Sequence, residues 1–340
     1  MNLLQLLSLT YLSHFVVSKS IQHHHFSQTI SSSSSSTSTI SNHDGNSAFL
    51  FAYFRTPAEA LHLAYSFDGL NYTALNNNMP VLNATIGQKS IRDPFVNLGP
   101  DNITYHIVTT NSWATKEILY YNTTDFITFS TGQVLPVMAN IPNTQCTWAP
   151  EWLFVSSKQM YFVFWASSLT ANGDKSIWGA WTKDFATFTT PNIIFSPGYT
   201  VIDADMVLLP NNTYLLVFKD ERDGTNYKAV RHAYSSTLGD PSGPFVEISN
   251  TVSPYLTEGP ELVVGAIPGL SAPYFLYYDC FEDGHYGVSQ VSADLLTYTE
   301  VPGTSCTSYG NSVNFPDECR HGSFVPISAA MLKALIAAYP

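Results

Sequence analysis

Five short phrases in this chain each place an ionisable side chain close to the start of an apolar, strand-like run. The phrases are "RDPFV" (92–96), "WAPEWLF" (148–154), "VIDADMV" (201–207), "EGPEL" (258–262) and "RHGSF" (320–324). Their ionisable groups recur at intervals of 58, 52, 55 and 63 residues and are Asp93, Glu151, Asp203, Glu258 and His321. Carboxylates that converge in an aromatic-walled pocket suit glycosidic bond cleavage, because one acid can protonate the leaving oxygen while another activates water. Such chemistry requires a fold that brings distant segments to one place.

A second phrase repeats with the same period in a different phase. It consists of an Asp, an apolar or Gly residue, and then Thr or Asn with an aromatic residue, as in "FDGLNYT" (67–73) and "KDFATFTT" (183–190). Its aspartates are spaced by 57, 59, 56 and 54 residues and are Asp68, Asp125, Asp184, Asp240 and Asp294. Each interval accommodates four short strands, so the repeat predicts an all-β, five-bladed β-propeller over residues 47–340, with the first series of ionisable groups around the mouth of a central channel. A β-sandwich with accidental repetition is the alternative.

The composition agrees with a β-rich fold and excludes several classes of function. With 14% aromatic and 12% charged residues, 20 Pro and 19 Gly, the chain favours strands and tight turns over long helices. A net charge of −12 without a Lys/Arg cluster argues against a nucleic-acid partner, since phosphate binding needs a basic surface. The chain also lacks the G-x-S-x-G, H-E-x-x-H, P-loop and G-x-G-x-x-G motifs of other enzyme classes.

The N-terminal segment has features of a secreted protein. Residues 1–20 contain an apolar run of signal-peptide length, which predicts a secreted, extracellular protein without a membrane partner. A membrane anchor is the alternative, but polar residues leave the run shorter than the roughly 18 apolar residues that a span needs. Residues 21–46 form a Ser/Thr-rich tract, read as a disordered linker or a glycosylated stalk. N-x-S/T sequons, consistent with a glycoprotein, occur at Asn71, Asn83, Asn102, Asn122 and Asn211.

The four cysteines allow three disulfide pairings in a secreted protein. Cys306 and Cys319 flank a short loop that contains Gly, Asn and Pro, so we predict a bridge between them. A bridge between Cys146 and Cys280 then follows by elimination.

The five phrases, in their order, resemble the blade-opening motifs of glycoside hydrolase family 43, the five-bladed propeller arabinofuranosidases, xylosidases and arabinanases. The resemblance covers about residues 47–340 and implies an inverting mechanism with three acids. By resemblance, Asp93 is the general base, Asp203 orients substrate and tunes the pKa of the acid, and Glu258 is the general acid. A nearby anionic Asp203, together with burial, is expected to disfavour ionisation of Glu258 and so to keep it protonated. His321 matches a histidine that, in many members, faces a central ion, often calcium, or a water molecule, while the reaction itself requires no cofactor. A buried histidine with satisfied hydrogen bonds is the alternative for His321. The N-terminal segment is expected to help complete the closing blade.

Other residues receive supporting roles. Trp148, at a blade mouth, is the candidate sugar platform, and Arg92 and Arg320 either bind sugar hydroxyls or hold carboxylates. Asp205 competes with Asp203, because residues two apart share a strand face. Glu151 is read as a polar lining residue and Glu261 as a strand residue or a support for the acids. Residues 328–339 have helical spacing and are expected to dock on the propeller. Taken singly, each Asp would be read as a turn former.

Two classes of function remain open at this point. The first is a secreted, inverting α-L-arabinofuranosidase that acts as a monomer on plant-type polysaccharide or oligosaccharide. A β-xylosidase or an endo-arabinanase of the same family is its alternative among enzymes. The second class is a carbohydrate-binding propeller without catalysis, and the presence of all three matching acids favours the enzyme.

Overall fold

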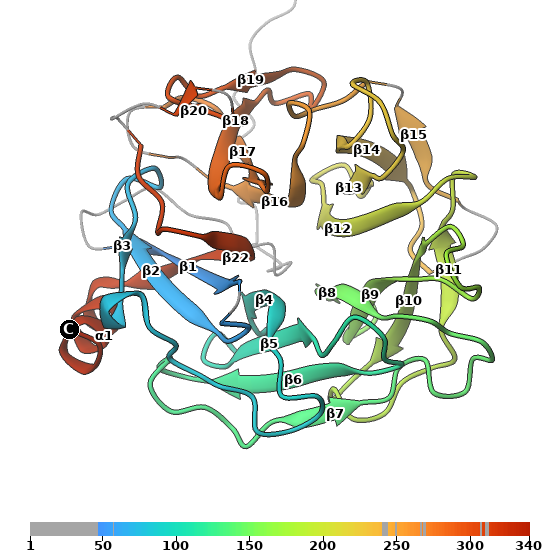
Figure 1. Ribbon diagram of the computed structural model, residues 1–340, viewed down its shortest axis with the longest axis horizontal. Coiled ribbons are helices and arrows are strands. Elements are labelled where there is room, and N and C mark those ends of the chain that lie inside the picture. Colours follow the sequence, from blue (N-terminus) through green and yellow to red (C-terminus); the bar gives the residue numbers. More distant parts are fainter. Residues whose placement is uncertain are drawn as a thin grey trace, which may run out of the picture. The chain divides into compact units, whose positions relative to one another are not determined.

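The structure is a computed structural model that describes residues 47–340 except 57, 240–243, 249, 266, 268–269, 307 and 310–312. The predicted signal peptide (1–20), the linker (21–46) and the repeat aspartate Asp240 lie outside the described residues. Five four-stranded antiparallel sheets are arranged radially around one axis, which confirms the predicted five-bladed β-propeller (Figure 1). Among the described residues, no helix has the length and apolarity to cross a membrane.

Four blades are each formed by consecutive strands, named here from the inside outward. Blade 1 contains β4 (Arg92–Leu98), β5 (Tyr105–Thr110), β6 (Ile118–Thr123) and β7 (Gln133–Leu135). Blade 2 contains β8 (Trp148–Val155), β9 (Met160–Ser167), β10 (Ser176–Thr182) and β11 (Asn192–Phe195). Blade 3 contains β12 (Val201–Leu208), β13 (Tyr214–Asp220), β14 (Ala229–Ser235) and β15 (Val246–Ile248). Blade 4 contains β16 (Glu258–Val264), β17 (Tyr274–Cys280), β18 (His285–Val291) and β19 (Tyr298–Glu300), followed by the small hairpin β20 (Thr304–Ser305) and β21 (Ser308–Tyr309).

The closing blade joins the two ends of the described chain. Its innermost strand is β22 (Cys319–Ser328), and its outer strands are β1 (Ser47–Arg55), β2 (His62–Ser66) and β3 (Thr73–Ala74), with a short 3-10 turn, η1 (Asn76–Asn78), after them. β22 pairs antiparallel with β1 along its whole length, and Figure 1 shows the red C-terminal strand beside the blue N-terminal one. The expectation that the N-terminal segment completes the closing blade is therefore confirmed.

The apolar core lies between the blades. Buried apolar side chains among the described residues form five clusters, one for each interface between adjacent blades. Both faces of a blade are covered by its neighbours, which explains strands such as "MYFVFWAS" (160–167) that are apolar on both faces instead of alternating.

The C-terminal helix α1 (Ala329–Ala338) packs against the interface between the closing blade and blade 1. The Ser328 side chain caps it by accepting a hydrogen bond from the Met331 backbone N–H. Leu332 and Leu335 are buried in the same cluster as Leu50 of β1. The predicted docking of this segment is confirmed.

The repeated aspartates of the second series stabilise outer turns of the blades. The Asp125 carboxylate accepts hydrogen bonds from the backbone N–H groups of Ile127 and Thr128, and Asp184 accepts the equivalent pair from Ala186 and Thr187. Such local side-chain to backbone bonds are typical of Asp in turns. Asp125 and Asp184 therefore have a structural role, away from the axis.

The predicted disulfide pairings are wrong, because the structure pairs Cys280 with Cys306. Cys280 ends β17 and lies with Cys306 in the apolar cluster between blades 3 and 4. Cys319 begins β22 and lies in the cluster between blade 4 and the closing blade, on the other face of the blade 4 sheet. Cys306 and Cys319 are close in sequence but separated by that sheet. Cys146 and Cys319 are buried free thiols.

Candidate active site

Every innermost strand contains a β-bulge at the same position, near its N-terminal end. Four of the bulges open with a residue at positive φ, namely Asp93 (47°), Ala149 (44°), Asp203 (50°) and Gly259 (51°). In β22 the extra residue of the bulge is His321. A bulge re-aims side chains and is common beside active sites. Because left-handed backbone is unfavourable for most residues other than Gly, the repeated positive φ at two aspartates indicates a site held under local strain.

Equivalent residues of the five innermost strands form three levels along the axis, and the predicted ionisable groups are divided among these levels. The level before the bulge contains Arg92, Trp148, Ile202, Glu258 and Arg320. The level that opens the bulge contains Asp93, Ala149, Asp203, Gly259 and His321, and the deeper level contains Phe95, Glu151, Asp205, Glu261 and Ser323. The spacing of the phrases predicted that Asp93, Glu151 and Glu258 occupy equivalent positions, and this prediction is wrong. Relative to the position of Asp93 in its strand, Glu258 lies one residue earlier and Glu151 two residues later. Glu151 belongs to the deeper level.

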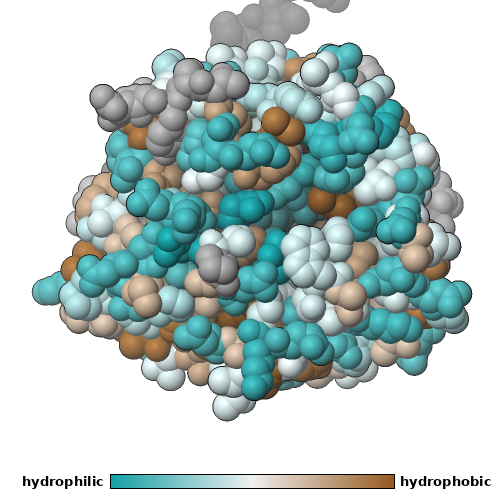
Figure 2. All heavy atoms as spheres, viewed as in Figure 1, coloured by the Kyte–Doolittle hydropathy of each residue, from teal (hydrophilic) through white to brown (hydrophobic). Residues whose placement is uncertain are grey.

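A pocket opens at this end of the axis. It is lined by Arg92, Asp93, Thr110, Trp113, Trp148, Ile202, Asp203 and Glu258. Figure 2 shows hydrophilic side chains gathered around a hollow near the middle of the propeller face. The structure thus brings together the three predicted acids with Arg92 and Trp148, whereas Arg320 and His321 act on these acids from beside the pocket. Sequence reasoning missed Thr110, Trp113 and Ile202.

Asp93 and Asp203 lie on either side of His321. The Nδ1 atom of His321 is 3.5 Å from Oδ1 of Asp93 and 3.9 Å from Oδ1 of Asp203. The backbone N–H of Gly259 donates a hydrogen bond to Oδ2 of Asp203, at 3.2 Å, and so links blade 4 to blade 3. These contacts hold the two aspartates in fixed positions at the axis.

Glu258 is held by two cations, and one of them is a residue that the sequence reading did not single out. The Nζ atom of Lys219, from β13, is 2.6 Å from one carboxylate oxygen of Glu258. An Arg320 guanidinium nitrogen is 2.5 Å from the other, and Arg320 also binds Asp279 through Nε at 2.8 Å. Of its two predicted roles, Arg320 therefore holds carboxylates.

The electrostatics of the acids differ from the expectation that Asp203 keeps Glu258 protonated. Burial, together with the charges of Glu258 and Asp93, raises the pKa of Asp203 well above its usual value. Burial also opposes ionisation of Glu258, but the charges of Lys219 and Arg320 outweigh it and lower the pKa of Glu258. The predicted direction for Glu258 is therefore wrong for this state of the protein, in which Glu258 is an ionised carboxylate.

One side of the pocket is an aromatic wall that Arg92 supports. The Arg92 guanidinium lies over the rings of Trp113, at 4.3 Å, and Phe54, at 4.7 Å, and its Nη1 is 2.6 Å from Glu59. The Trp148 indole N–H donates to the Trp113 carbonyl oxygen, and the two rings meet edge to face. Trp113, in the loop between β5 and β6, remains 60% exposed. It therefore offers an open ring face at the pocket, as the sugar platform predicted for Trp148 would require.

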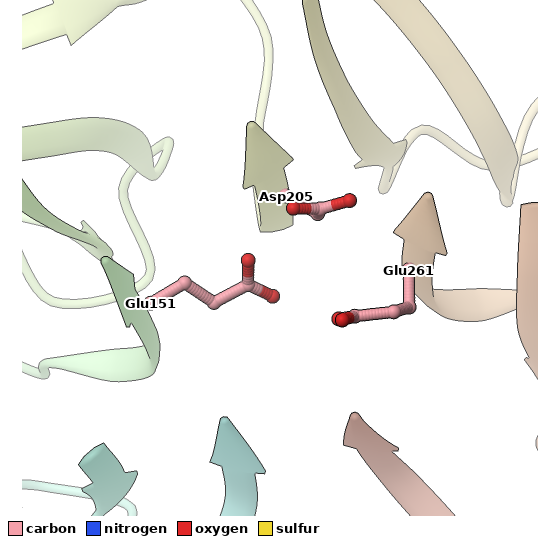
Figure 3. Close-up of side chains that lie close together, drawn as sticks. All are labelled: Glu151, Asp205 and Glu261. Carbon is pink, nitrogen blue, oxygen red and sulfur yellow. The ribbon is translucent and has the colours of Figure 1, made fainter. Parts of the chain in front are cut away.

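A second group of carboxylates lies at the deeper level. Glu151, Asp205 and Glu261 extend toward one another from β8, β12 and β16 (Figure 3), with one oxygen of each within 4.8 Å of the others. Burial raises the pKa values of all three, that of Asp205 to about 6. The Leu262 backbone N–H donates to Asp205, but Oε2 of Glu151 has no hydrogen-bond partner among the described residues. Converging carboxylate oxygens with an unpaired member fit a hard cation such as Ca²⁺.

A five-bladed propeller with three acids at the mouths of blades 1, 3 and 4 and an adjoining aromatic wall defines a candidate carbohydrate-active site. The profile of a glycosyl hydrolase family related to family 43, described as "Probable glycosyl hydrolase domain", matches residues 44–332. The chain belongs to this family of family-43-type glycoside hydrolases, and the resemblance seen in the sequence is confirmed. No curated protein shows significant similarity to the chain.

Solved structures share the fold at low sequence identity. One is a family-93 α-L-arabinofuranosidase of Fusarium graminearum in complex with arabinobiose: it is 14% identical, with a TM-score of 0.50 over 77% of this chain and 79% of that chain. Another is an engineered family-43 glycoside hydrolase with endo-xylanase and exo-arabinofuranosidase activity: it is 13% identical, with a TM-score of 0.50 over 81% of this chain and 53% of that chain. At these identities the likeness concerns the fold.

Proposed function

We propose that the protein is a secreted, inverting α-L-arabinofuranosidase that removes arabinosyl side chains from plant-type polysaccharide. The observation that carries this proposal is the convergence of Asp93, Asp203 and Glu258 on one pocket beside an aromatic wall. The choice of sugar is supported by the arabinobiose bound to the family-93 structure of the same fold.

The catalytic roles follow the chemistry of inverting glycosidases. Asp93 takes a proton from the water that attacks the anomeric carbon, and Glu258 donates a proton to the leaving oxygen on the opposite face. His321 orients the Asp93 carboxylate, from which its Nδ1 is 3.5 Å away. Asp203, buried between the other two acids, orients the substrate and couples electrostatically to both. Trp113 and Trp148 offer apolar faces to the sugar.

Two alternatives differ from this proposal in substrate or in chemistry. A β-xylosidase or endo-arabinanase would use the same three acids on another sugar or within a chain. A carbohydrate-binding propeller would bind sugar without turnover. A panel of aryl glycosides separates them, because turnover of any member removes the binding-only alternative and the member cleaved identifies the sugar.

We also propose that the protein is secreted and carries N-glycans. Four of the sequon asparagines are exposed in the folded domain, namely Asn71, Asn83, Asn102 and Asn211, whereas Asn122 is half-buried. We expect N-glycans on the exposed positions of the protein secreted as a monomer. Glycosidase treatment followed by intact-mass measurement would detect them.

We also propose a structural cation, held by Glu151, Asp205 and Glu261 rather than centred on His321, which faces Asp93 and Asp203 instead. When bound, Ca²⁺ would neutralise three buried carboxylates beneath the catalytic level. After chelation, added Ca²⁺ should raise the melting temperature of the wild-type protein but not of Glu151→Gln. Equal responses of the two proteins, or no response of the wild type, would count against the site.

Replacements of the two principal acids test the enzymatic proposal. Glu258→Gln should lose most activity on glycosides with poor leaving groups but much less on aryl glycosides with good ones, which need little protonation. Asp93→Asn should be nearly inactive on both, because the water stays unactivated. If Glu258→Gln impairs both substrates equally while Asp93→Asn stays active, the proposed roles are wrong.

A further inference from the structure

Lys219 is a buried cation between two carboxylates. Its side chain is only 4% exposed, and its Nζ lies 2.6 Å from Oε2 of Glu258 and 2.7 Å from Oε1 of Glu221. The ammonium also lies over the Phe281 ring, 4.3 Å from its centre. The single cation is thus shared between the proposed general acid and a second carboxylate outside the catalytic set.

The two ion pairs of Glu258 conflict with its proposed role as the general acid. A general acid must carry a proton when substrate is bound, yet both Glu258 oxygens accept hydrogen bonds from cations. The titratable and charged groups that surround Glu258 on the neighbouring strands are Lys219 of β13, Asp203 of β12, Asp279 of β17, and Arg320 and His321 of β22. The two cations in direct contact keep the carboxylate ionised in the free protein.

The two cations are not equally fixed. Arg320 is anchored by Asp279, a fully buried carboxylate that also accepts the His321 backbone N–H. Its planar guanidinium matches this geometry and is not easily turned away. Lys219 has a flexible stem, and its other partner, Glu221, is 22% exposed and also pairs with Lys228 at 3.3 Å. Lys219 can therefore leave Glu258 and keep a partner.

We propose that Lys219 is a positioning residue that withdraws from Glu258 to Glu221 when the sugar binds. This proposal rests on Glu258 being the general acid. The carboxylate then takes up one proton from solvent and passes it to the glycosidic oxygen, while Asp93 returns the proton of the attacking water to solvent, so that protons balance over the cycle. Binding of substrate thus converts Glu258 from an ion-pair partner into an acid.

The test compares two pH profiles of the same protein on a substrate with a poor leaving group. The basic limb of kcat/KM reports the acid in the free enzyme, and the basic limb of kcat reports it in the enzyme–substrate complex. In the wild type, the kcat limb should lie at higher pH than the kcat/KM limb. An opposite charge in contact lowers the pKa of a carboxyl group by about 1–3 units, so we expect a gap of this order.

Removal of the cation should close this gap. In Lys219→Met, the basic limb of kcat/KM should move up toward that of kcat, whereas in the matched control Lys219→Arg the lower position should persist. Glu221 keeps Lys228 as a partner in both variants. An unchanged kcat/KM limb in folded Lys219→Met would overturn the proposal and leave Lys219 with a structural role.

A second variant keeps the proposal testable if Lys219→Met does not fold. Glu221→Gln removes the carboxylate onto which Lys219 withdraws, so the kcat limb should move to lower pH while the kcat/KM limb stays nearly in place. An unmoved kcat limb would contradict the proposal. Glu258→Gln separates this failure from failure of the proposed function: if it keeps the basic limb, Glu258 is not the acid.

Discussion

The disulfide between Cys280 and Cys306 allows a quantitative test of how the hairpin β20–β21 is attached to blade 4. It closes a loop with a sequence separation of 26 residues. On the loop-entropy model, a cross-link of this span stabilises the folded state by about 3.5 kcal/mol, since it restricts the unfolded chain. We therefore expect the double variant Cys280→Ala/Cys306→Ala to lose about this free energy of unfolding, plus a smaller amount for the lost sulfur packing.

The measurement is urea unfolding followed by tryptophan fluorescence, with and without a reductant. Cys319→Ala is the matched control, because it removes a fully buried sulfur that forms no bridge. It should cost only about 1 kcal/mol, as expected for the deletion of one buried heavy atom. Reductant should destabilise the wild type and Cys319→Ala but leave the double variant unchanged.

Two results would refute this reasoning. One is a double variant that is no less stable than Cys319→Ala. The other is non-reducing peptide mapping that finds Cys319, rather than Cys280, joined to Cys306. The first result would mean that the bridge does not stabilise the fold, and the second would mean that Cys306 lies on the same face of the blade 4 sheet as Cys319.

Three further predictions concern packing and the pocket. Leu335→Ala should cost about 2–5 kcal/mol of unfolding free energy in urea titrations, because Leu335 is fully buried under the closing blade, whereas exposed Ile336→Ala should cost less than 1 kcal/mol. Trp113→Ala should raise KM for oligosaccharides more than for aryl glycosides, with kcat little changed; an unchanged KM in steady-state assays would remove Trp113 from the binding surface. Arg92→Lys should raise KM for oligosaccharides by a smaller factor than Trp113→Ala does, since a flat guanidinium supports the Trp113 ring. An unchanged KM would show that Trp113 keeps its position without the Arg92 guanidinium.

The propeller was predictable because two motif series share one period. Described blades repeat the same turn chemistry at residues such as Asp125 and Asp184, and blades 1 to 4 each begin with an innermost strand rich in apolar residues, so local signals agree with the global fold. The convergence of Asp93, Asp203 and Glu258 followed from the same period. Position along the axis was harder, because the spacing of the phrases does not align the strands residue by residue. Asp93 opens the bulge of its strand, whereas Glu151 follows the bulge of its strand and so lies at a deeper level.

Other features of the site depend on contacts that no sequence pattern encodes. Lys219 reads as one charged residue near the end of the apolar strand "YLLVFKD" (214–220), and its pairing with Glu258 arises only where blades 3 and 4 meet. The cysteine pairing failed for a related reason, since sequence distance does not reveal on which face of a sheet a side chain lies. Trp113 lies in a loop, where the period-two pattern of strands carries no information.

The anomeric configuration of the first-formed product distinguishes the proposed inverting mechanism from a retaining one. Proton NMR during turnover of the glycoside that the wild-type protein cleaves fastest distinguishes the two anomers before they equilibrate. If Asp93 activates water and Glu258 protonates the leaving oxygen, the first-formed product has inverted configuration. A retained configuration would contradict it, because one of the acids would then have to form a covalent bond to the sugar.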